Sequence, residues 1–227
     1  MAERGELHPH GGDWLRDVVF GLNDGLVTTL VFIMAVSAVA SGHVVVIALS
    51  ELLAGGVSMG LGGYLSGRTT REVLRQRIAT ERHEIAHEPE EERAELRAIY
   101  QEKGLRGPLL DRVVGYLTAD EERWLRALVR DELGVTEADE APPWRQGLLV
   151  GGAFMAGAVV PLLPFLVALP SPRWWAYGLT AVAALALGAI ESRYTLAGPL
   201  RSGLEFLAAV TVGTLVGVAI GLLLHAA

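Results

Sequence analysis

Two long apolar stretches near the start of the chain define its architecture. The first covers residues 18–40 and the second covers residues 44–66, with only Ser41, Gly42 and His43 between them. Each stretch is long enough to cross a bilayer as a single helix, for which about 20 apolar residues suffice. The short break between them predicts a tight hairpin of two membrane-spanning helices.

Beyond residue 66 the pattern changes twice. Residues 67–145 are strongly polar, and three further apolar stretches follow at residues 146–169, 174–190 and 204–225. The pattern predicts an all-α membrane protein with five transmembrane helices and a helical domain inserted between spans two and three. The chain is therefore divided into an N-terminal segment (1–17), spans one and two (18–66), the inserted domain (67–145) and spans three to five (146–225).

The inserted domain has the pattern of several short helices. No glycine or proline occurs from Arg68 to His87, so the helix of span two is expected to continue until Pro89 stops it. Three more helices are expected at residues 90–102, 109–117 and 119–133, the last started by a capping box from Thr118 to Glu121.

Basic residues predict the orientation in the membrane. Eighteen of the 19 Lys and Arg residues lie in the N-terminal segment, the inserted domain or the turn between spans four and five, and only Arg173 lies on the other side. Because cytoplasmic loops carry an excess of Lys and Arg, the N-terminal segment and the inserted domain are expected in the cytoplasm and the C-terminus outside. We expect a multi-pass protein of the inner (plasma) membrane of the cell.

Composition agrees with a membrane protein. Hydrophobic residues make up 51% of the chain and the mean hydropathy is +0.37, a value that soluble proteins of this length rarely reach. Cysteine is absent, which excludes disulfides and thiolate metal ligands. The polar, acidic N-terminus is not expected to be a cleavable signal peptide.

Two acids lie inside the first two spans. Asp24 and Glu51 each place a carboxylate in an apolar helix, at a cost of about 3 kcal/mol on insertion scales unless something pairs with it. Neither span contains Lys or Arg, so the expected partner is a cation from outside the chain. Asp17 shares a face with Asp24, and Met59 lies about 80° from Glu51 on the helical wheel, where its thioether suits a softer transition metal.

The inserted domain is rich in acids at helical spacing. Of its 18 acids, Glu81, Glu84 and Glu88 lie on one face of a helix, because they follow at i, i+3 and i+7. The next helix repeats the i, i+3 spacing at Glu92 and Glu95, with Glu91 beside them. Glu132 lies at the end of the last helix of the domain. Carboxylates on neighbouring helices can converge on a hard divalent cation. The alternative is a solvated acidic face paired with arginines.

Histidine adds one candidate ligand. Glu84 and His87 form a Glu-x-x-His pair of the kind found in di-iron bundles, but a complete site of that type needs two such pairs. His87 is therefore expected to be an accessory metal ligand at most, together with Glu88 and Glu91. We find no nucleophile elbow, no phosphate-binding glycine loop and no clustered histidine motif, so neither an enzyme nor a resident cofactor nor a nucleic-acid partner is expected.

Two motifs resemble the vacuolar iron transporter family, also called the CCC-type iron and manganese transporters. They are DVVFGLNDGL at residues 17–26 and ELLAGGVSMGLGGY at residues 51–64. The resemblance implies a homodimer in the lipid bilayer whose first two spans form the ion path at the subunit interface. It also implies export of Fe²⁺ from the cytosol in exchange for protons, with Mn²⁺ as a frequent second substrate.

The resemblance also implies roles for individual residues. Asp24, Glu51 and Met59 match the transmembrane metal path of the family. The glutamates of its cytoplasmic metal-binding domain are matched by Glu81, Glu84, Glu92, Glu95 and Glu132. The chain departs from some eukaryotic members at Leu128 and Val129, where those members have methionines, and it lacks the proline that plant members have in span one.

These observations predict a transporter that exports Fe²⁺ and Mn²⁺, with a glutamate-rich cytoplasmic domain that captures the ions. The alternative is a membrane-anchored sensor or storage protein that binds metal without transporting it. Acids inside the spans favour transport, because a sensor would not need them.

Overall fold

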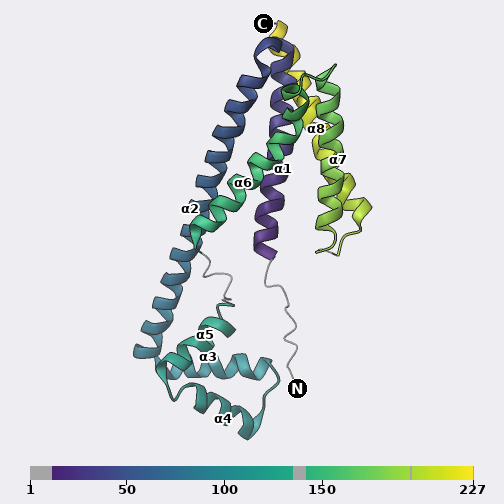
Figure 1. Cartoon of the computed structure of the whole chain (residues 1–227). Coiled ribbons are helices and arrows are strands. Elements are labelled where there is room, and N and C mark those ends of the chain that lie inside the picture. Colours follow the sequence, from purple (N-terminus) through teal and green to yellow (C-terminus); the bar gives the residue numbers. More distant parts are fainter. Residues whose placement is uncertain (1–11, 135–141, 195, 227) are drawn as a thin grey trace, which may run out of the picture. The chain divides into compact units, whose positions relative to one another are not determined.

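The computed structural model describes residues 12–134, 142–194 and 196–226. Within these ranges it contains eight α-helices, one short 3₁₀ helix and no strand (Figure 1). Five of the helices are long and apolar enough to cross a membrane. The predicted all-α class is therefore confirmed, as is the prediction of five helices long and apolar enough to span a membrane. Much of the N-terminal segment predicted at 1–17 lies outside the described residues.

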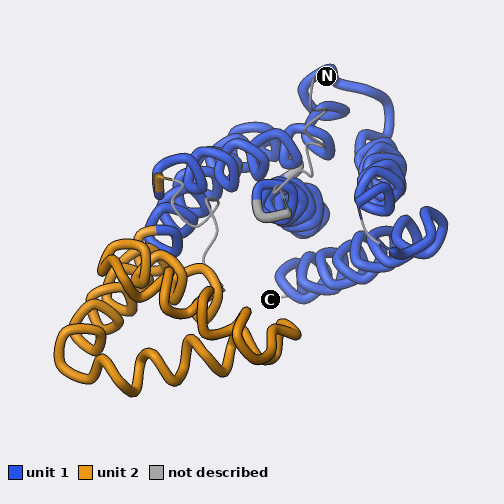
Figure 2. The backbone as a smooth tube through the Cα atoms, turned by 90° about the horizontal axis from the view of Figure 1, so that it is seen from below, with its two compact units in different colours: residues 1–67, 143–227 blue, residues 68–142 orange. Residues whose placement is uncertain are grey.

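The chain separates into two compact units, coloured in Figure 2. Unit 1 combines residues 1–67 with residues 143–227, and unit 2 comprises residues 68–142. The helices of unit 1 are α1 (Gly12–Val39), η1 (Ser41–His43), the first part of α2 (Val44–His87), α6 (Pro143–Leu166), α7 (Pro172–Glu191) and α8 (Pro199–Ala226). Unit 2 contains the rest of α2, α3 (Pro89–Glu102), α4 (Gly107–Leu117) and α5 (Glu121–Asp131).

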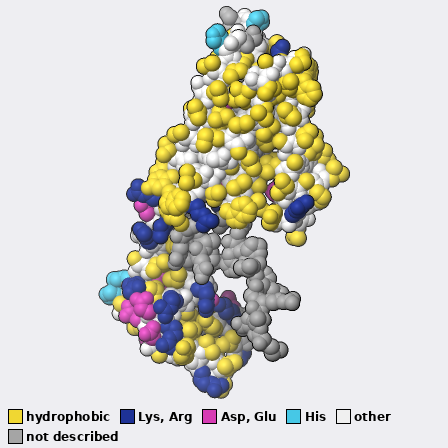
Figure 3. Space-filling view, viewed as in Figure 1, with side chains coloured by type: hydrophobic (Ala, Val, Ile, Leu, Met, Phe, Trp, Pro, Cys, Tyr) yellow, Lys and Arg dark blue, Asp and Glu magenta, His cyan; other side chains and the backbone are white. Residues whose placement is uncertain are grey.

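Helix α1 is the central helix of unit 1. It packs against α6, α7 and α8, and Figure 1 shows it running between them. Leu30 and Ile33 of α1 are fully buried, Ile33 in a cluster with Phe154 and Leu162 of α6 and Leu30 in a second cluster with Val210 of α8. Hydrophobic side chains cover much of the surface of unit 1 that Figure 3 shows, as expected for helices that face lipid.

Glycines allow α2 and α6 to approach closely. A Cβ atom added at Gly151 of α6 would lie 2.7 Å from the carbonyl oxygen of Gly56 and 2.9 Å from the Cα of Gly60. A Cβ at Gly55 would meet the ring of Phe154, whereas Gly62 has nothing within 4 Å. Most of the glycine-rich face of span two therefore packs against α6 of the same chain, as small residues do in membrane helix pairs.

Unit 2 has a small hydrophobic core of its own. Ile85 of α2, Leu96 of α3 and Leu128 of α5 are buried together there, with Trp124 and Leu125. Lys, Arg, Asp and Glu side chains gather on the surface of this unit (Figure 3). Because it buries an apolar cluster under a charged surface, unit 2 has the pattern of a water-exposed helical domain.

Two helix starts in unit 2 follow from local chemistry. Pro89 occupies the first turn of α3, where its missing N–H costs nothing. Helix α5 begins at Glu121, and its N-cap is Asp120, whose side chain accepts a 2.9 Å hydrogen bond from the backbone N–H of Arg123. The predicted helix at 119–133 is therefore shorter than expected, and Thr118 is not its cap.

The contact between α2 and α6 predicts opposite effects at neighbouring positions. Gly151→Ala should destabilise the protein by about 1–3 kcal/mol, because the new methyl group meets backbone atoms that cannot move aside. Gly152→Ala should be neutral or stabilise by up to about 1 kcal/mol, because nothing lies within 4 Å of that position and alanine favours the helix. Thermal unfolding in detergent compares the two variants, and equal stabilities would contradict this packing.

Candidate metal centre

Three glutamates from three helices meet inside unit 2. Carboxylate oxygens of Glu81 in α2, Glu92 in α3 and Glu132 at the C-cap of α5 all lie within 4.8 Å of one another. We call these residues the glutamate cluster. Three carboxylates at this separation can all reach one divalent cation, for which oxygen ligands lie at about 2.0–2.6 Å.

The core of unit 2 explains why these three residues meet. Each glutamate lies one helical turn from a buried core residue: Glu81 from Ile85, Glu92 from Leu96, and Glu132 from Leu128. Residues four apart share a face of a helix. When the three core residues pack together, they bring the three carboxylates to the edge of the same core.

The cluster holds its negative charge without a basic partner. The side chains of Glu81 and Glu92 are buried, and the Oε2 atom of each has no hydrogen-bond partner. No salt bridge reaches any residue of the cluster within the described part of the chain. Buried charges are normally paired or bound to a metal, so these unpaired oxygens are candidate ligands for a cation.

Burial and mutual repulsion change the protonation of the cluster. Burial, followed by repulsion from Glu132, raises the pKa of Glu81 to about 7. Burial, followed by repulsion from Glu95, raises the pKa of Glu92 to about 7. Burial likewise raises the pKa of Glu132, and Glu95 and Glu84 add to it. Glu81 and Glu92 therefore exchange protons near neutral pH, where a metal ion would compete with protons for the same oxygens.

The raised pKa values also affect stability. A carboxyl group whose pKa is higher in the folded state than in the unfolded state binds more protons when folded. Its contribution to stability is present below pH 4.5, the ordinary value, and is lost as the pH rises through about 7. Metal-free unit 2 is thus strained by its own charge at neutral pH, and a bound cation would relieve that strain.

The other predicted acids divide into two groups. Glu84, Glu88 and Glu95 lie close enough to repel the charge of Glu92, so they surround the cluster. Glu91 is exposed in the first turn of α3. His87 is also exposed, and its Nδ1 atom lies 2.8 Å from the carbonyl oxygen of His83. The structure therefore does not bring Glu91 or His87 into the cluster.

The predicted membrane acids lie in unit 1. Glu51 of α2 is half-buried and accepts a 2.9 Å hydrogen bond from the hydroxyl of Thr29 in α1. Asp24 is half-buried and accepts a 3.3 Å hydrogen bond from Thr28, one turn further along α1. Glu51 is therefore linked to α1 through Thr29 and not through Asp24.

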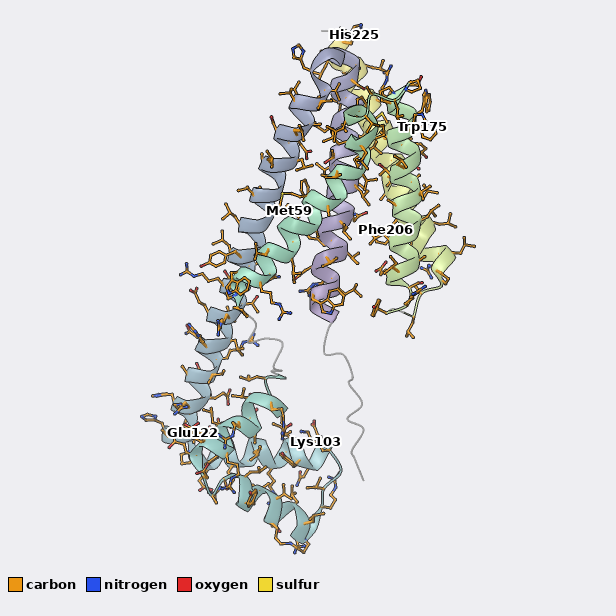
Figure 4. The ribbon with its side chains drawn as sticks, in the orientation of Figure 1. Met59, Lys103, Glu122, Trp175, Phe206 and His225 are labelled. Carbon is orange, nitrogen blue, oxygen red and sulfur yellow. The ribbon has the colours of Figure 1, made fainter. Side chains whose placement is uncertain are left out.

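Met59 and Asp17 are the other two residues of the predicted path. Met59 is half-buried on α2 (Figure 4) and packs against the hydrophobic cluster that contains Phe154. Asp17, near the start of α1, accepts a 3.4 Å hydrogen bond from Gln146 of α6 and lies 3.8 Å from Arg16. Asp17 thus has protein partners, unlike a carboxylate that waits for an ion.

Comparison with known proteins covers nearly the whole chain. The model of the VIT family matches residues 15–222. The chain belongs to the VIT family. It is 31% identical to vacuolar iron transporter 1 of Oryza sativa subsp. japonica, over 88% of this chain and 81% of the relative. It is 30% identical to vacuolar iron transporter 1 of Arabidopsis thaliana, over 88% of this chain and 82% of the relative. A vacuolar iron transporter of Acanthamoeba castellanii is 32% identical over 78% of this chain and 64% of the relative.

Membership of the VIT family decides between classes of protein. The family is one of membrane transporters and not of enzymes, which agrees with the five apolar helices. The resemblance inferred from residues 17–26 and 51–64 is therefore confirmed at the level of the family.

One sequence-based expectation about histidine is wrong. Residues 83–87 of this VIT chain read HEIAH, so His83 and His87 form a pair with HExxH spacing on one helix. Their ring centroids lie 3.9 Å apart. The chain therefore does contain a pair of neighbouring histidines, and the spacing of residues 83–87 in the sequence is the signal for it.

A half-buried aspartate beside the cluster holds the end of α5. Asp131 accepts a 2.8 Å hydrogen bond from the hydroxyl of Tyr100 and pairs with Lys103, labelled in Figure 4, at 2.6 Å. Burial alone would raise the pKa of Asp131, but hydrogen bonds from Arg130, Lys103 and Tyr100 outweigh it and lower the pKa to about 2. Its stabilising effect is present above the ordinary pKa of 3.8 and is lost as the pH falls through about 2. Asp131 therefore ties Glu132, the next residue, to the end of α3.

This contact predicts a local effect of Asp131→Asn. The substitution keeps the shape but removes the charge that Lys103 and Arg130 contact, so α5 should lose about 1–3 kcal/mol of local stability. Hydrogen exchange of the amides of α5 measures this loss. Asp111→Asn is the control, because Asp111 pairs with Arg97 at the surface, where such pairs contribute about 0–1 kcal/mol. Equal exchange in both variants would contradict a role for Asp131 in holding α5.

Proposed function

We propose that this chain exports Fe²⁺, and also Mn²⁺, from the cytosol in exchange for protons. In this proposal unit 2 is a cytoplasmic domain that captures the ions and unit 1 carries the path through the membrane. The observation that carries the proposal is the glutamate cluster, whose buried oxygens lack any partner of positive charge. The names of the relatives, vacuolar iron transporters, support iron as the cargo.

The donor set of the cluster fits a divalent cation of this kind. Carboxylates suit Fe²⁺ and Mn²⁺, and the described part of unit 2 offers neither a cysteine nor a methionine to select a softer ion. Leu128 and Val129 occupy the positions where some eukaryotic members have methionines, and Leu128 is fully buried in the core. The site therefore favours capture of several divalent ions with modest selectivity.

Within unit 1, Asp24, Glu51 and Met59 form the proposed path. Each carboxylate offsets part of the free energy that an ion loses when it sheds water inside an apolar helix bundle. The hydroxyl of Thr29 orients Glu51 by a hydrogen bond and leaves the second carboxylate oxygen for another partner. Protons can occupy the same carboxylates when the metal has left, which is the chemical basis for the proposed exchange of ions and protons.

The proposal also includes a homodimer through spans one and two. Two copies of Asp24 and Glu51 around one twofold axis would double the number of ligands available to one ion. The excess of basic residues on one side supports a cytoplasmic unit 2 and an external C-terminus in the plasma membrane. The relatives are named as vacuolar proteins, so the membrane proposed here differs from theirs.

The raised pKa values predict how metal binding depends on pH. Binding of Mn²⁺ to the full-length protein in detergent should weaken as the pH falls through about 7, because Glu81 and Glu92 then take up protons. Calorimetric titration at pH 8, 7 and 6 measures the change. A solvated acidic helix face would behave differently, since its carboxylates stay ionised down to about pH 4.5.

Two sets of substitutions at matched positions control this titration. Glu81→Gln combined with Glu92→Gln should remove the part of Mn²⁺ binding that changes with pH near 7. Glu102→Gln combined with Glu121→Gln changes the same charge at exposed positions and should leave it intact. Binding by the first pair equal to wild type would mean that the cluster is not the capture site.

A flux assay tests the membrane path and separates transport from metal sensing. Uptake of Fe²⁺ into vesicles that contain the purified protein should require a pH gradient. Glu51→Gln and Asp24→Asn should each lower it by at least about tenfold, because each removes a charge that stabilises the dehydrated ion. Ser50→Ala, at an exposed neighbour of Glu51 that bonds its own helix, is the matched control.

The outcome of the flux assay distinguishes the two candidate functions. Absence of flux from the wild-type protein, with Mn²⁺ binding retained, would favour a membrane-anchored sensor or store. Normal flux in both acid variants would remove Asp24 and Glu51 from the path. Met59→Leu keeps the volume of the side chain but loses the thioether, so it should change the preference among ions more than the fold.

A further inference from the structure

Two histidines lie near the C-terminal end of α2 and have no role in the proposed function. His83 and His87 are four residues apart, so their side chains leave the helix on one face, about 40° apart. Both are exposed, and their rings stack with centroids 3.9 Å apart and planes inclined by 32°. Figure 3 shows histidine side chains on the surface of unit 2.

A hydrogen bond to the backbone fixes the orientation of the His87 ring and leaves its Nε2 atom available to a metal. The Nδ1 atom of His87 lies 2.8 Å from the carbonyl oxygen of His83. A carbonyl oxygen can only accept, so Nδ1 must carry the proton in this contact. In the neutral ring the lone pair is then on Nε2, which is free to bind a metal. A backbone carbonyl that accepts from the second nitrogen is the usual arrangement for histidine ligands, because it fixes the orientation of the ring.

The two rings lie close enough to be turned toward one ion. Two imidazole nitrogens on one tetrahedral ion, each at about 2.1 Å, would lie roughly 3.4 Å apart. The ring centroids lie 3.9 Å apart in the metal-free stack. Because residues four apart are neighbours on one helix face, rotation of the side chains can point one nitrogen of each ring at the same ion. We propose that His83 and His87 form a separate site for a late divalent transition metal such as Cu²⁺, Ni²⁺ or Zn²⁺, on the face of α2 away from the glutamate cluster.

The chemistry of the pair differs from that of the cluster. Imidazole binds Cu²⁺ and Ni²⁺ more tightly than Fe²⁺ or Mn²⁺ and also suits Zn²⁺, whereas carboxylates suit Mn²⁺ and Mg²⁺. On an ideal helix His83 lies about 160° around the axis from Glu81, so one ion cannot reach both. The pair also lies at the C-terminal end of α2, where the helix dipole favours a cation. Late transition metals would therefore be held on one face of α2 and the proposed cargo on another.

The HExxH spacing does not make this site hydrolytic. A catalytic zinc site has three protein ligands and one open position. Among the residues that the structure describes, no third carboxylate or imidazole lies within 4.8 Å to complete a group with this pair. Glu84 between the two histidines lies close enough to the glutamate cluster to repel its charge. The pair is thus a two-ligand site completed by water.

Electron paramagnetic resonance of bound Cu²⁺ tests the proposal. The sample is the full-length protein in detergent, purified without a histidine tag and with His8 and His10 replaced by alanine so that they add no imidazole. Less than one equivalent of Cu²⁺ should show coupling to two imidazole nitrogens. His83→Ala combined with His87→Ala should remove this coupling and weaken binding at least about tenfold, because losing even an outer partner of a ligand costs 10- to 100-fold.

Two control pairs make the outcome specific. His43→Ala combined with His225→Ala removes the described histidines of unit 1 and should leave the Cu²⁺ spectrum unchanged. Glu81→Gln combined with Glu92→Gln should leave it unchanged as well, and the His83 and His87 double variant should bind Mn²⁺ as the wild type does. A Cu²⁺ spectrum that survives in the double variant, or that disappears with the glutamates, would overturn the proposal. Neither result depends on whether the protein transports iron.

Discussion

Negative charge on two buried carboxylates, Glu81 and Glu92, without a basic partner is the constraint on which unit 2 depends. The hydrophobic core formed by Ile85, Leu96 and Leu128 brings three carboxylates together at its edge. Protein folding does not normally tolerate unpaired charges in such a place. The cluster must therefore bind protons or a cation, and the pKa values near 7 of Glu81 and Glu92 mean that the two compete at neutral pH. A site of this kind can release its ion when protons become abundant.

The structure around the cluster is built to hold these groups in place. Asp131, paired with Lys103 and bonded to Tyr100, anchors the end of α5 immediately before Glu132. Pro89 ends α2 and starts α3, so that Glu81 and Glu92 come from two helices that change direction between them. Because each carboxylate is held by core packing or by the contacts of Asp131, the carboxylates are close together without any ion.

Unit 1 differs from unit 2 because its carboxylates, Asp24 and Glu51, lie in apolar helices of a helix bundle. Close packing through Gly56, Gly60 and Gly151 joins α2 to α6, while a hydrogen bond from Thr29 joins Glu51 to α1. Backbone contacts of this kind leave little freedom for the helices to slide. A rigid surrounding of this sort suits a path in which the charge of Glu51 must meet an ion and not a neighbouring side chain.

The sequence by itself determined the elements whose signal is local. Five apolar stretches of sufficient length, the proline at residue 89 and the spacing of Glu81 and Glu84 predicted the spans, a helix boundary and an acidic face, because length and helical period depend only on neighbouring residues. Two motifs in the first spans also identified the family. The same local reading failed at Thr118, because the choice between two neighbouring caps depends on the backbone conformation that Asp120 adopts.

Only the tertiary structure decided which of these residues meet. Glu132 lies 40 residues or more from Glu81 and Glu92 in the sequence, and packing around Leu128 brings it to them. Gly55 and Gly62 look alike in the sequence, but one faces Phe154 and the other faces open space. The stacking of His83 on His87 was likewise settled by side-chain orientation. A helical repeat says which side chains share a face, whereas the partner of that face is chosen by contacts between segments far apart in the chain.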